Sequence, residues 1–169
     1  MKKVFIKGGT IVNSKESFAG NILIEDEKIA KVSDPDEFIE LDNDTKVVDA
    51  SGKLIFPGFI DAHTHFDLHV AGTVTCDDFY SGTKAAISGG TTTIIDFGTQ
   101  YKGETLNEGM DNWLNKAKDG VFCDYGIHMS ISDWNEEAKR QCRDMMDRGV
   151  TTFKIYLTYD ILLKDDEAF

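Results

Sequence analysis

The chain has few cysteines and few prolines. Its 169 residues include three cysteines, Cys76, Cys123 and Cys142, and no pair of them has the CxxC spacing. An odd number of cysteines without that spacing predicts neither a disulfide framework nor a zinc knuckle. We therefore expect buried, reduced thiols in a cytoplasmic protein. Proline occurs only at Pro35 and Pro57, and there is no low-complexity tract, so a disordered chain is not expected.

Basic residues and long apolar runs are also scarce. The sequence has 18 lysines and arginines against 30 aspartates and glutamates, giving a formal net charge of −12. Proteins that bind nucleic acids draw affinity from basic side chains that neutralise phosphates, so we expect no nucleic-acid partner. No run approaches the ~20 apolar residues of a membrane span, and Lys7 and Gly8 interrupt the N-terminal segment before a signal-type stretch can form. No membrane association is predicted.

The first fifty residues consist of short apolar stretches separated by turn signals. Candidate strands cover 4–6, 10–12, 21–24, 28–32 and 46–49. Gly8-Gly9 predicts a turn after the first stretch, and the acidic residues 25–27 predict a hairpin between the third and fourth. Strands this short and local predict part of a small β-sandwich or open barrel. We place this domain at residues 1–53.

From residue 54 onward, apolar strands alternate with helical stretches. Strands are expected at 54–61, 92–98, 124–130 and 152–158, and helices at 80–88, 106–118 and 133–148. Ser132 or Asp133 is the expected N-cap of the last helix. Strand–helix repetition predicts an α/β fold with parallel strands in residues 54–169. Half of a (β/α)₈ barrel and a doubly wound sheet both fit, although no GxGxxG follows any strand.

Two histidines lie at the C-terminal end of the first of these strands. Side chains two residues apart on a strand point the same way, so His63 and His65 should project together. Convergent imidazoles are natural metal ligands, and enzyme sites in α/β folds lie at this end of the strands. A chance HxH pair is the alternative, which this position makes less attractive. For Asp61 two roles stay open: orienting an imidazole or capping the loop.

A lysine interrupts the last apolar strand. If Lys154 is buried, it must be paired or neutral. A neutral amine can add carbon dioxide and become a carbamate able to bridge two metals. The alternative is a lysine whose ammonium reaches water at a strand edge. Tyr159 follows the strand and is either an oxyanion donor or an ordinary loop aromatic. His128 is expected to be a hydrogen-bonded core histidine, and His69 a surface or lining residue.

Six segments, taken in order, carry a further signal. They are 7–12, 56–67, 72–79, 89–97, 124–128 and 152–159. The second reads FPGFIDAHTHFD and the last TFKIYLTY. The HxH pair alone is a weak signal, but the ordered set resembles the hydantoinase/dihydropyrimidinase branch of the amidohydrolase superfamily. The resemblance covers essentially the whole chain.

This resemblance implies the N-terminal half of a (β/α)₈ TIM-type barrel preceded by strands of a small β-sandwich. It implies two divalent metal ions, usually zinc, bridged by hydroxide and by Lys154 as N6-carboxylysine, which requires carbon dioxide. His63 and His65 would hold the more buried metal, and Tyr159 would stabilise the oxyanion. The implied reaction opens a cyclic amide, a dihydropyrimidine or a hydantoin, to an N-carbamoyl amino acid.

The resemblance also implies a substrate-lining set and a form of assembly. Leu68, Val70 and Tyr156 would line the substrate, and relatives are usually homotetramers. Family enzymes are more than twice as long, and their remaining metal ligands and general base come from later strands. We therefore expect this chain alone to be an inactive fragment of a hydrolase.

Three other functions remain open at this stage. An allantoinase or a dihydroorotase would use similar ligands, although the segment 72–79 favours the hydantoinase branch. Non-catalytic scaffold relatives, the collapsin response mediator proteins, lack the metal ligands, so retention of His63, His65 and Lys154 argues against them. A dimerising or regulatory role of the fragment itself has no positive support in the sequence.

Overall fold

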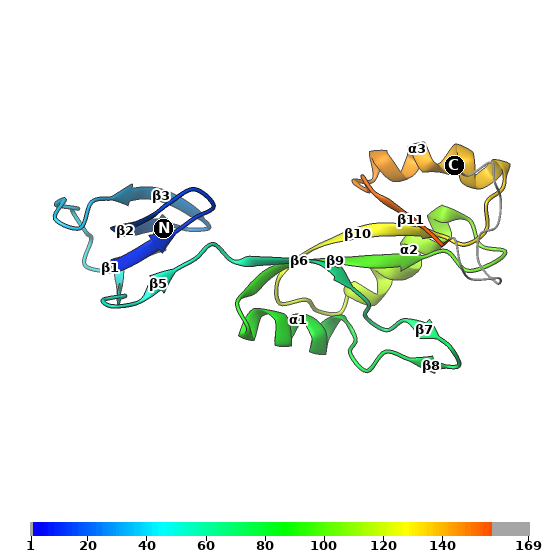
Figure 1. Ribbon diagram of the computed structural model, residues 1–169, viewed down its shortest axis with the longest axis horizontal. Coiled ribbons are helices and arrows are strands. Elements are labelled where there is room, and N and C mark those ends of the chain that lie inside the picture. Colours follow the sequence, from blue (N-terminus) through cyan, green and yellow to red (C-terminus); the bar gives the residue numbers. More distant parts are fainter. Residues whose placement is uncertain (1, 157–169) are drawn as a thin grey trace. The chain divides into compact units, whose positions relative to one another are not determined.

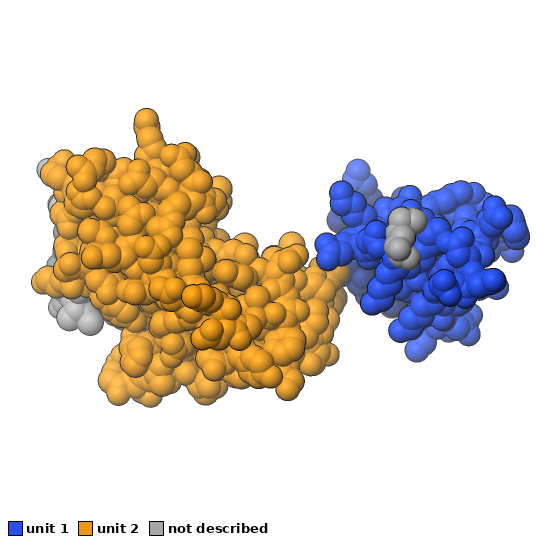
Figure 2. Space-filling model, turned by 180° about the vertical axis from the view of Figure 1, so that it is seen from behind, with its two compact units in different colours: residues 1–57 blue, residues 58–169 orange. Residues whose placement is uncertain are grey.

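The computed structural model of the chain describes residues 2–156 (Figure 1). These residues belong to two compact units, 1–57 and 58–169, which Figure 2 shows in different colours. Within the described part of the chain, no helix is long and apolar enough to cross a membrane.

The first unit is a five-stranded sheet in the order β3-β2-β1-β4, with β5 also beside β1. Its strands are β1 (Lys3–Val12), β2 (Ser17–Glu25), β3 (Lys28–Ser33), β4 (Lys46–Asp49) and β5 (Leu54–Ile55). The pairs β1–β2 and β2–β3 are antiparallel, which confirms the hairpin predicted at residues 25–27. Both β4 and β5 pair with β1 in parallel, so residues 54–55 pack with the first unit.

The turn predicted at Gly8-Gly9 is wrong, because β1 runs straight through it. The pairing of β1 with β2 shifts register between Ile6 and Gly9, as a β-bulge does. Gly8 has φ 75°, a conformation that glycine adopts at low cost because it has no Cβ. Its N–H donates to Oδ1 of the buried Asn21 at 2.9 Å. The two glycines therefore allow an irregular strand instead of ending it.

The second unit is built on a parallel sheet in the order β11-β10-β9-β6. Its elements in chain order are β6 (Phe59–Thr64), β7 (His69–Val70), β8 (Thr73–Val74), α1 (Phe79–Ser88), β9 (Thr91–Thr99), α2 (Leu106–Ala117), β10 (Asp124–Ile131), α3 (Glu136–Asp147) and β11 (Phe153–Ile155). Each new strand joins the same edge of the sheet, beside the strand before it (Figure 1). A doubly wound sheet would reverse this order, so the predicted half of a (β/α)₈ barrel is confirmed.

The single strand predicted at 54–61 is two strands. β5 ends at Ile55 in the first unit, and β6 begins at Phe59 in the second. Pro57 lies between them and lacks the N–H that a ladder position needs. The apolar run therefore serves two sheets, and the sequence pattern alone could not divide it.

Side-chain caps fix where the three helices begin. Asp78 forms a capping box with Ser81 at the start of α1, and Thr105 forms one with Glu108 at the start of α2. The cap of α3 is Asn135, whose carboxamide oxygen accepts from the N–H of Ala138, so the expected caps Ser132 and Asp133 are wrong.

Asp133 instead forms hydrogen bonds with the loop that follows β9. Its carboxylate accepts from the N–H of Gly103 at 3.3 Å, and its carbonyl accepts from the side chain of Gln100 at 3.3 Å. The N–H groups of Ser132 and Asp133 both donate to Oε1 of Gln100. The helix therefore starts only after these bonds are made.

The apolar core lies between one face of the parallel sheet and the helices. α1 and α2 pack on β9, α2 also packs on β10, and α3 packs on α2. The most deeply buried members of this core are Phe79, Ile94, Leu106, Trp113, Met129, Ile131, Met145 and Val150. Phe97, which is buried but does not belong to this core, marks the opposite face of the sheet.

Candidate active site

A cluster of nitrogen-bearing side chains lies on the face of the sheet opposite the helices. Its centre is Phe97 of β9, which is buried at 7% exposure but does not belong to the helix-side core. The ring of Phe97 lies 4.6 Å from the ring of His63, 4.9 Å from that of His65 and 4.9 Å from that of His128, between centroids. The Nζ of Lys154 lies 4.3 Å from the same centroid. Three strands of the sheet and the end of β6 thus meet at one phenyl ring.

The two histidines of the HxH motif lie side by side at the end of β6. Their ring centroids are 5.1 Å apart, with the rings nearly perpendicular at 81°. His63 is exposed and His65 is half-buried. Asp61 is exposed, and its carboxylate accepts from the backbone N–H of His63 at 3.1 Å. The contact of Asp61 within the described residues is therefore with the backbone of the motif.

Lys154 lies on β11, at the opposite edge of the sheet from β6, and its amine lies over aromatic rings. It is half-buried on β11, and its Nζ lies 4.9 Å from the ring of Tyr156 as well as over Phe97. Within residues 2–156 its ammonium faces these rings and forms no ion pair with a carboxylate. The amine of Lys154 therefore lies on the same side of the sheet as the rings of the two histidines, over Phe97.

The electrostatics of the cluster favour a neutral His65. Burial lowers the pKa of this imidazole, and the charges of Lys154 and then His63 lower it further. A neutral imidazole is the form that binds a metal ion. The buried Nδ1 of His65 has no hydrogen-bond partner among the described residues. A buried ring nitrogen left in this way fits a ligand role.

The described residues offer several candidate metal donors but no complete group of them. No group of three or more histidine, cysteine, aspartate or glutamate side chains within residues 2–156 could hold a metal ion. The available donors are the imidazoles of His63 and His65 and the amine of Lys154. As a carbamate, Lys154 would add oxygen donors, and the set would then fit zinc, which accepts both imidazole and carboxylate ligands.

His128 takes part in this cluster, although the sequence predicted only a core position. It is half-buried, its Nε2–H donates to the carbonyl of Ala62 at 3.1 Å, and its Nδ1 contacts the hydroxyl of Thr152. The prediction of a hydrogen-bonded histidine is therefore confirmed. Its position could not be predicted from the sequence: His128 on β10 pairs in register with Phe97 on β9.

Asp96 is a second residue that sequence reasoning missed. It is fully buried on the helix side of β9, at 0% exposure. Its Oδ1 accepts from the hydroxyl of Thr64 at 2.9 Å and from the N–H of Phe66 at 3.1 Å, and its Oδ2 accepts from Nε1 of Trp113 at 2.9 Å. The signal was available, since Asp96 is the one charged residue in the run 92–98.

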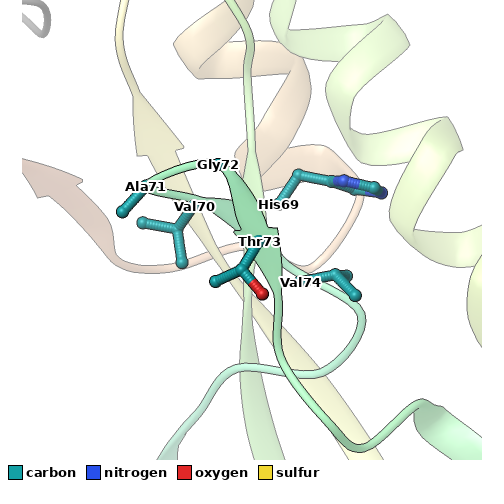
Figure 3. A pocket seen from close by; sticks show the side chains of 6 residues that line it. All are labelled: His69, Val70, Ala71, Gly72, Thr73 and Val74. Atoms are coloured by element: carbon teal, nitrogen blue, oxygen red, sulfur yellow. The ribbon is translucent and has the colours of Figure 1, made fainter.

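The β7–β8 hairpin follows the HxH motif and carries an open hollow of about 600 Å³. The hollow is lined by His69, Val70, Ala71, Gly72, Thr73 and Val74. Figure 3 shows the side chains of Val70 and Thr73 on one side of the hairpin and those of His69 and Val74 on the other. Val70 is 51% exposed and Val74 is 42% exposed, so the hairpin presents apolar surface.

The other predicted lining and catalytic residues fall in different places. Leu68 is half-buried and packs against the helix-side core instead of the hollow. Tyr156 lies beside Lys154. Tyr159, the predicted oxyanion donor, lies outside the described residues.

Comparisons with known proteins agree on one group. A sequence model described as the amidohydrolase family matches residues 54–162. A protein named dihydropyrimidinase from Dictyostelium discoideum is 41% identical over 98% of this chain and 33% of its own length. A protein named D-hydantoinase from Geobacillus stearothermophilus is 43% identical over 95% of this chain and 34% of its own length.

Solved structures give the same result. A crystal structure of a D-hydantoinase superposes with a TM-score of 0.89 at 40% identity, covering 98% of this chain and 35% of that one. The chain therefore spans about a third of the length of the curated relatives it matches.

Proposed function

The chain belongs to the amidohydrolase family, and from this premise we propose that it forms part of a metal-dependent hydrolase that opens a cyclic amide. The proposed substrates are dihydropyrimidines or hydantoins, opened to N-carbamoyl amino acids. The observation that carries the proposal is the convergence of His63, His65 and Lys154 around Phe97. Relatives named both dihydropyrimidinase and D-hydantoinase support the substrate class.

The proposed ligands are the two imidazoles of the HxH motif and a modified lysine. His63 and His65 would hold a metal ion through their imidazoles, and Lys154 as N6-carboxylysine would contribute carboxylate oxygens to the metal centre. In that modification the amine nitrogen attacks the carbon of carbon dioxide, a new N–C bond forms, and the nitrogen loses a proton to solvent. Two divalent ions, which we propose to be zinc, would supply Lewis-acid chemistry that lowers the pKa of a bound water and polarises an amide carbonyl.

The residues of this chain would prepare that chemistry in separate ways. Burial keeps His65 neutral and ready to bind, because it lowers the pKa of the imidazole. Phe97 supports both imidazoles and the lysine stem on one apolar surface. We propose Tyr159 as the donor to the oxyanion that develops on the amide carbonyl.

Substrate binding is proposed for the face that carries these groups and for the β7–β8 hairpin. The exposed side chain of Val70 offers an apolar contact to a ring substituent. Tyr156, with its ring near Lys154, offers a second contact. The acidic net charge of −12 disfavours polyanionic partners. A cytoplasmic homotetramer acting on small molecules is the proposed working form.

The test is metal content together with ring opening, on protein expressed from its complete gene. The purified protein is analysed for zinc and assayed with dihydrouracil, hydantoin, allantoin and dihydroorotate. We expect about two metal ions per chain and turnover of one of the first two. The variant His63→Ala/His65→Ala should lose metal and turnover, whereas His69→Ala should retain its metal.

Other outcomes would contradict the proposal. Turnover of allantoin or dihydroorotate alone would replace the substrate class while keeping the metal site. A protein that holds no metal and opens no ring, even with added zinc and bicarbonate, would make a scaffold role the better hypothesis.

A further inference from the structure

We propose that Asp96 is a positioning residue for the HxH motif, acting from the helix side of the sheet through Thr64 and Phe66. The proposal rests on the proposed function, since it concerns how His63 and His65 are held for metal binding. Asp96 itself lies on the far face of β9 from the imidazoles and touches neither of them.

The carboxylate of Asp96 contacts both residues that flank His65 in the sequence. Thr64 and Phe66 are the residues directly before and after His65, and both donate to Oδ1 of Asp96, at 2.9 and 3.1 Å. The two residues that flank His65 are therefore held to one oxygen atom, Thr64 by its side-chain hydroxyl and Phe66 by its backbone N–H. Trp113 of α2 donates to the other oxygen at 2.9 Å and fixes the carboxylate.

This segment needs such a clamp because the sheet does not hold it regularly. The pairing of β6 with β9 shifts register between Asp61 and Thr64, so the ladder is interrupted at His63. β6 ends at Thr64, which leaves the N–H of Phe66 beyond the ladder. Bulges of this kind re-aim side chains next to active sites. The Asp96 carboxylate adds side-chain hydrogen bonds at Thr64 and Phe66, just where the regular pairing resumes and then ends.

The chemistry of the acceptor also favours a purpose beyond filling space. Burial raises the pKa of the Asp96 carboxyl, and the hydrogen bonds from Trp113, Thr64 and Phe66 oppose that rise. The Asp96 carboxylate is fully buried, and removing a carboxylate from water is costly. A carboxylate can accept from three donors without presenting one of its own, which an amide of the same shape cannot do.

Helix α2, which carries Trp113, also contacts the chain just after the HxH motif, at Asp67. Lys116 of α2 donates to the carbonyl of Asp67 at 2.6 Å and pairs with its carboxylate at 3.2 Å. The ammonium also lies 4.0 Å from the ring centroid of Trp113. Asp67 has a positive φ of 47°, which marks the sharp turn out of the motif. α2 therefore anchors the chain on the C-terminal side of His65, at two points.

The expected consequence of loosening the clamp is weaker metal binding by an otherwise folded protein. Residues that orient metal ligands without touching the metal typically cost ~10–100-fold in affinity or activity when they are replaced. We expect losses in this range for Thr64→Val, which removes one donor and keeps the branched side chain. Asp96→Asn should also weaken metal binding, because the NH₂ group of its amide opposes at least one of the three donors.

The experiment compares these variants with two controls in protein expressed from its complete gene. Thr64→Ser keeps the hydroxyl and should restore most of the affinity. Asp111→Asn alters an exposed carboxylate of α2 that pairs with Arg148, and it should bind metal like the wild type. The metal affinity is measured with zinc by chelator competition, and the coordination geometry by the visible absorption of the Co²⁺-loaded protein. A fall in kcat with little change in KM is expected for the two clamp variants.

The outcomes separate this proposal from the proposed function. If Thr64→Val and Asp96→Asn are folded by circular dichroism and bind zinc as tightly as Asp111→Asn, with the same Co²⁺ spectrum, the positioning role is refuted while the hydrolase stands. If Asp96→Asn does not fold, Thr64→Val alone decides the question. If the wild type binds no zinc and opens no ring, the proposed function fails, and this proposal fails with it.

Discussion

Replacing Phe97 by alanine would remove the surface on which the candidate site is assembled. Phe97 is only 7% exposed, and its ring lies against the side chains of His63, His65, His128 and Lys154. An aromatic ring that buries about 150 Å² contributes roughly 4 kcal/mol at ~25 cal/mol/Å². The contact with the ammonium adds about 0.5–1 kcal/mol. We therefore expect Phe97→Ala to lower the free energy of unfolding by about 3–5 kcal/mol, the usual range for this substitution in a core.

The assay is urea unfolding of the metal-free protein, followed by circular dichroism. Phe97→Leu keeps most of the apolar volume and should cost about 1 kcal/mol. Met146→Ala, at a position 61% exposed on α3, should stay within about 0.5 kcal/mol of the wild type. A cost below about 1 kcal/mol for Phe97→Ala, with an unchanged dependence on urea, would show that the ring supports nothing and would refute the argument.

Two further predictions concern titration and packing. In the metal-free protein, NMR should show His65 titrating below about 6.5, because burial, Lys154 and His63 lower its pKa. The unfolded chain then binds more protons, so the free energy of unfolding should fall as the pH drops below that value, and His65→Gln should remove this dependence. Gly82→Ala would place a Cβ 2.3 Å from Cε1 of Phe66, so we expect a loss of about 1–3 kcal/mol, and an unchanged melting temperature would contradict the packing.

The shared face of His63 and His65, and the unusual place of Lys154 in its apolar strand, could be predicted because strand periodicity is local. Side chains two residues apart share a face, and a lysine inside an apolar strand stands out from its neighbours. Neither inference needs the position of any other strand. Their roles as ligands stay predictions, as does that of Tyr159, which lies outside the described residues.

The positions of Phe97 and His128 could not be predicted in the same way. In an apolar strand buried on both faces, a phenylalanine on the site side cannot be distinguished from one on the core side. Only the register Phe97↔His128 shows that they are level, and that register is set by the crossover through α2. Sequence periodicity contains no information about it.

The N-cap of α3 and the β-bulge at Gly8 in β1 could not be predicted for a related reason. Ser132, Asp133 and Asn135 are all good caps by residue type, and the choice among them depends on Gln100, which lies 35 residues before Asn135 in the sequence. Gly8 suits a turn and a bulge equally well, and its partner Asn21 decides between them. In both cases a distant polar side chain selects one of several locally acceptable structures.

Asp96 and Phe97 are consecutive residues of β9 and contact the HxH motif from opposite faces of the sheet. Successive residues of a strand point to opposite faces, so one stretch of β9 presents a carboxylate to the helix side and a phenyl ring to the site side. The carboxylate holds the backbone around His65, and the ring supports its imidazole. A shift of β9 by one residue would exchange the two faces and lose both contacts together. The register of this strand against β6, bulge included, is therefore the structural feature on which the proposed metal site most depends.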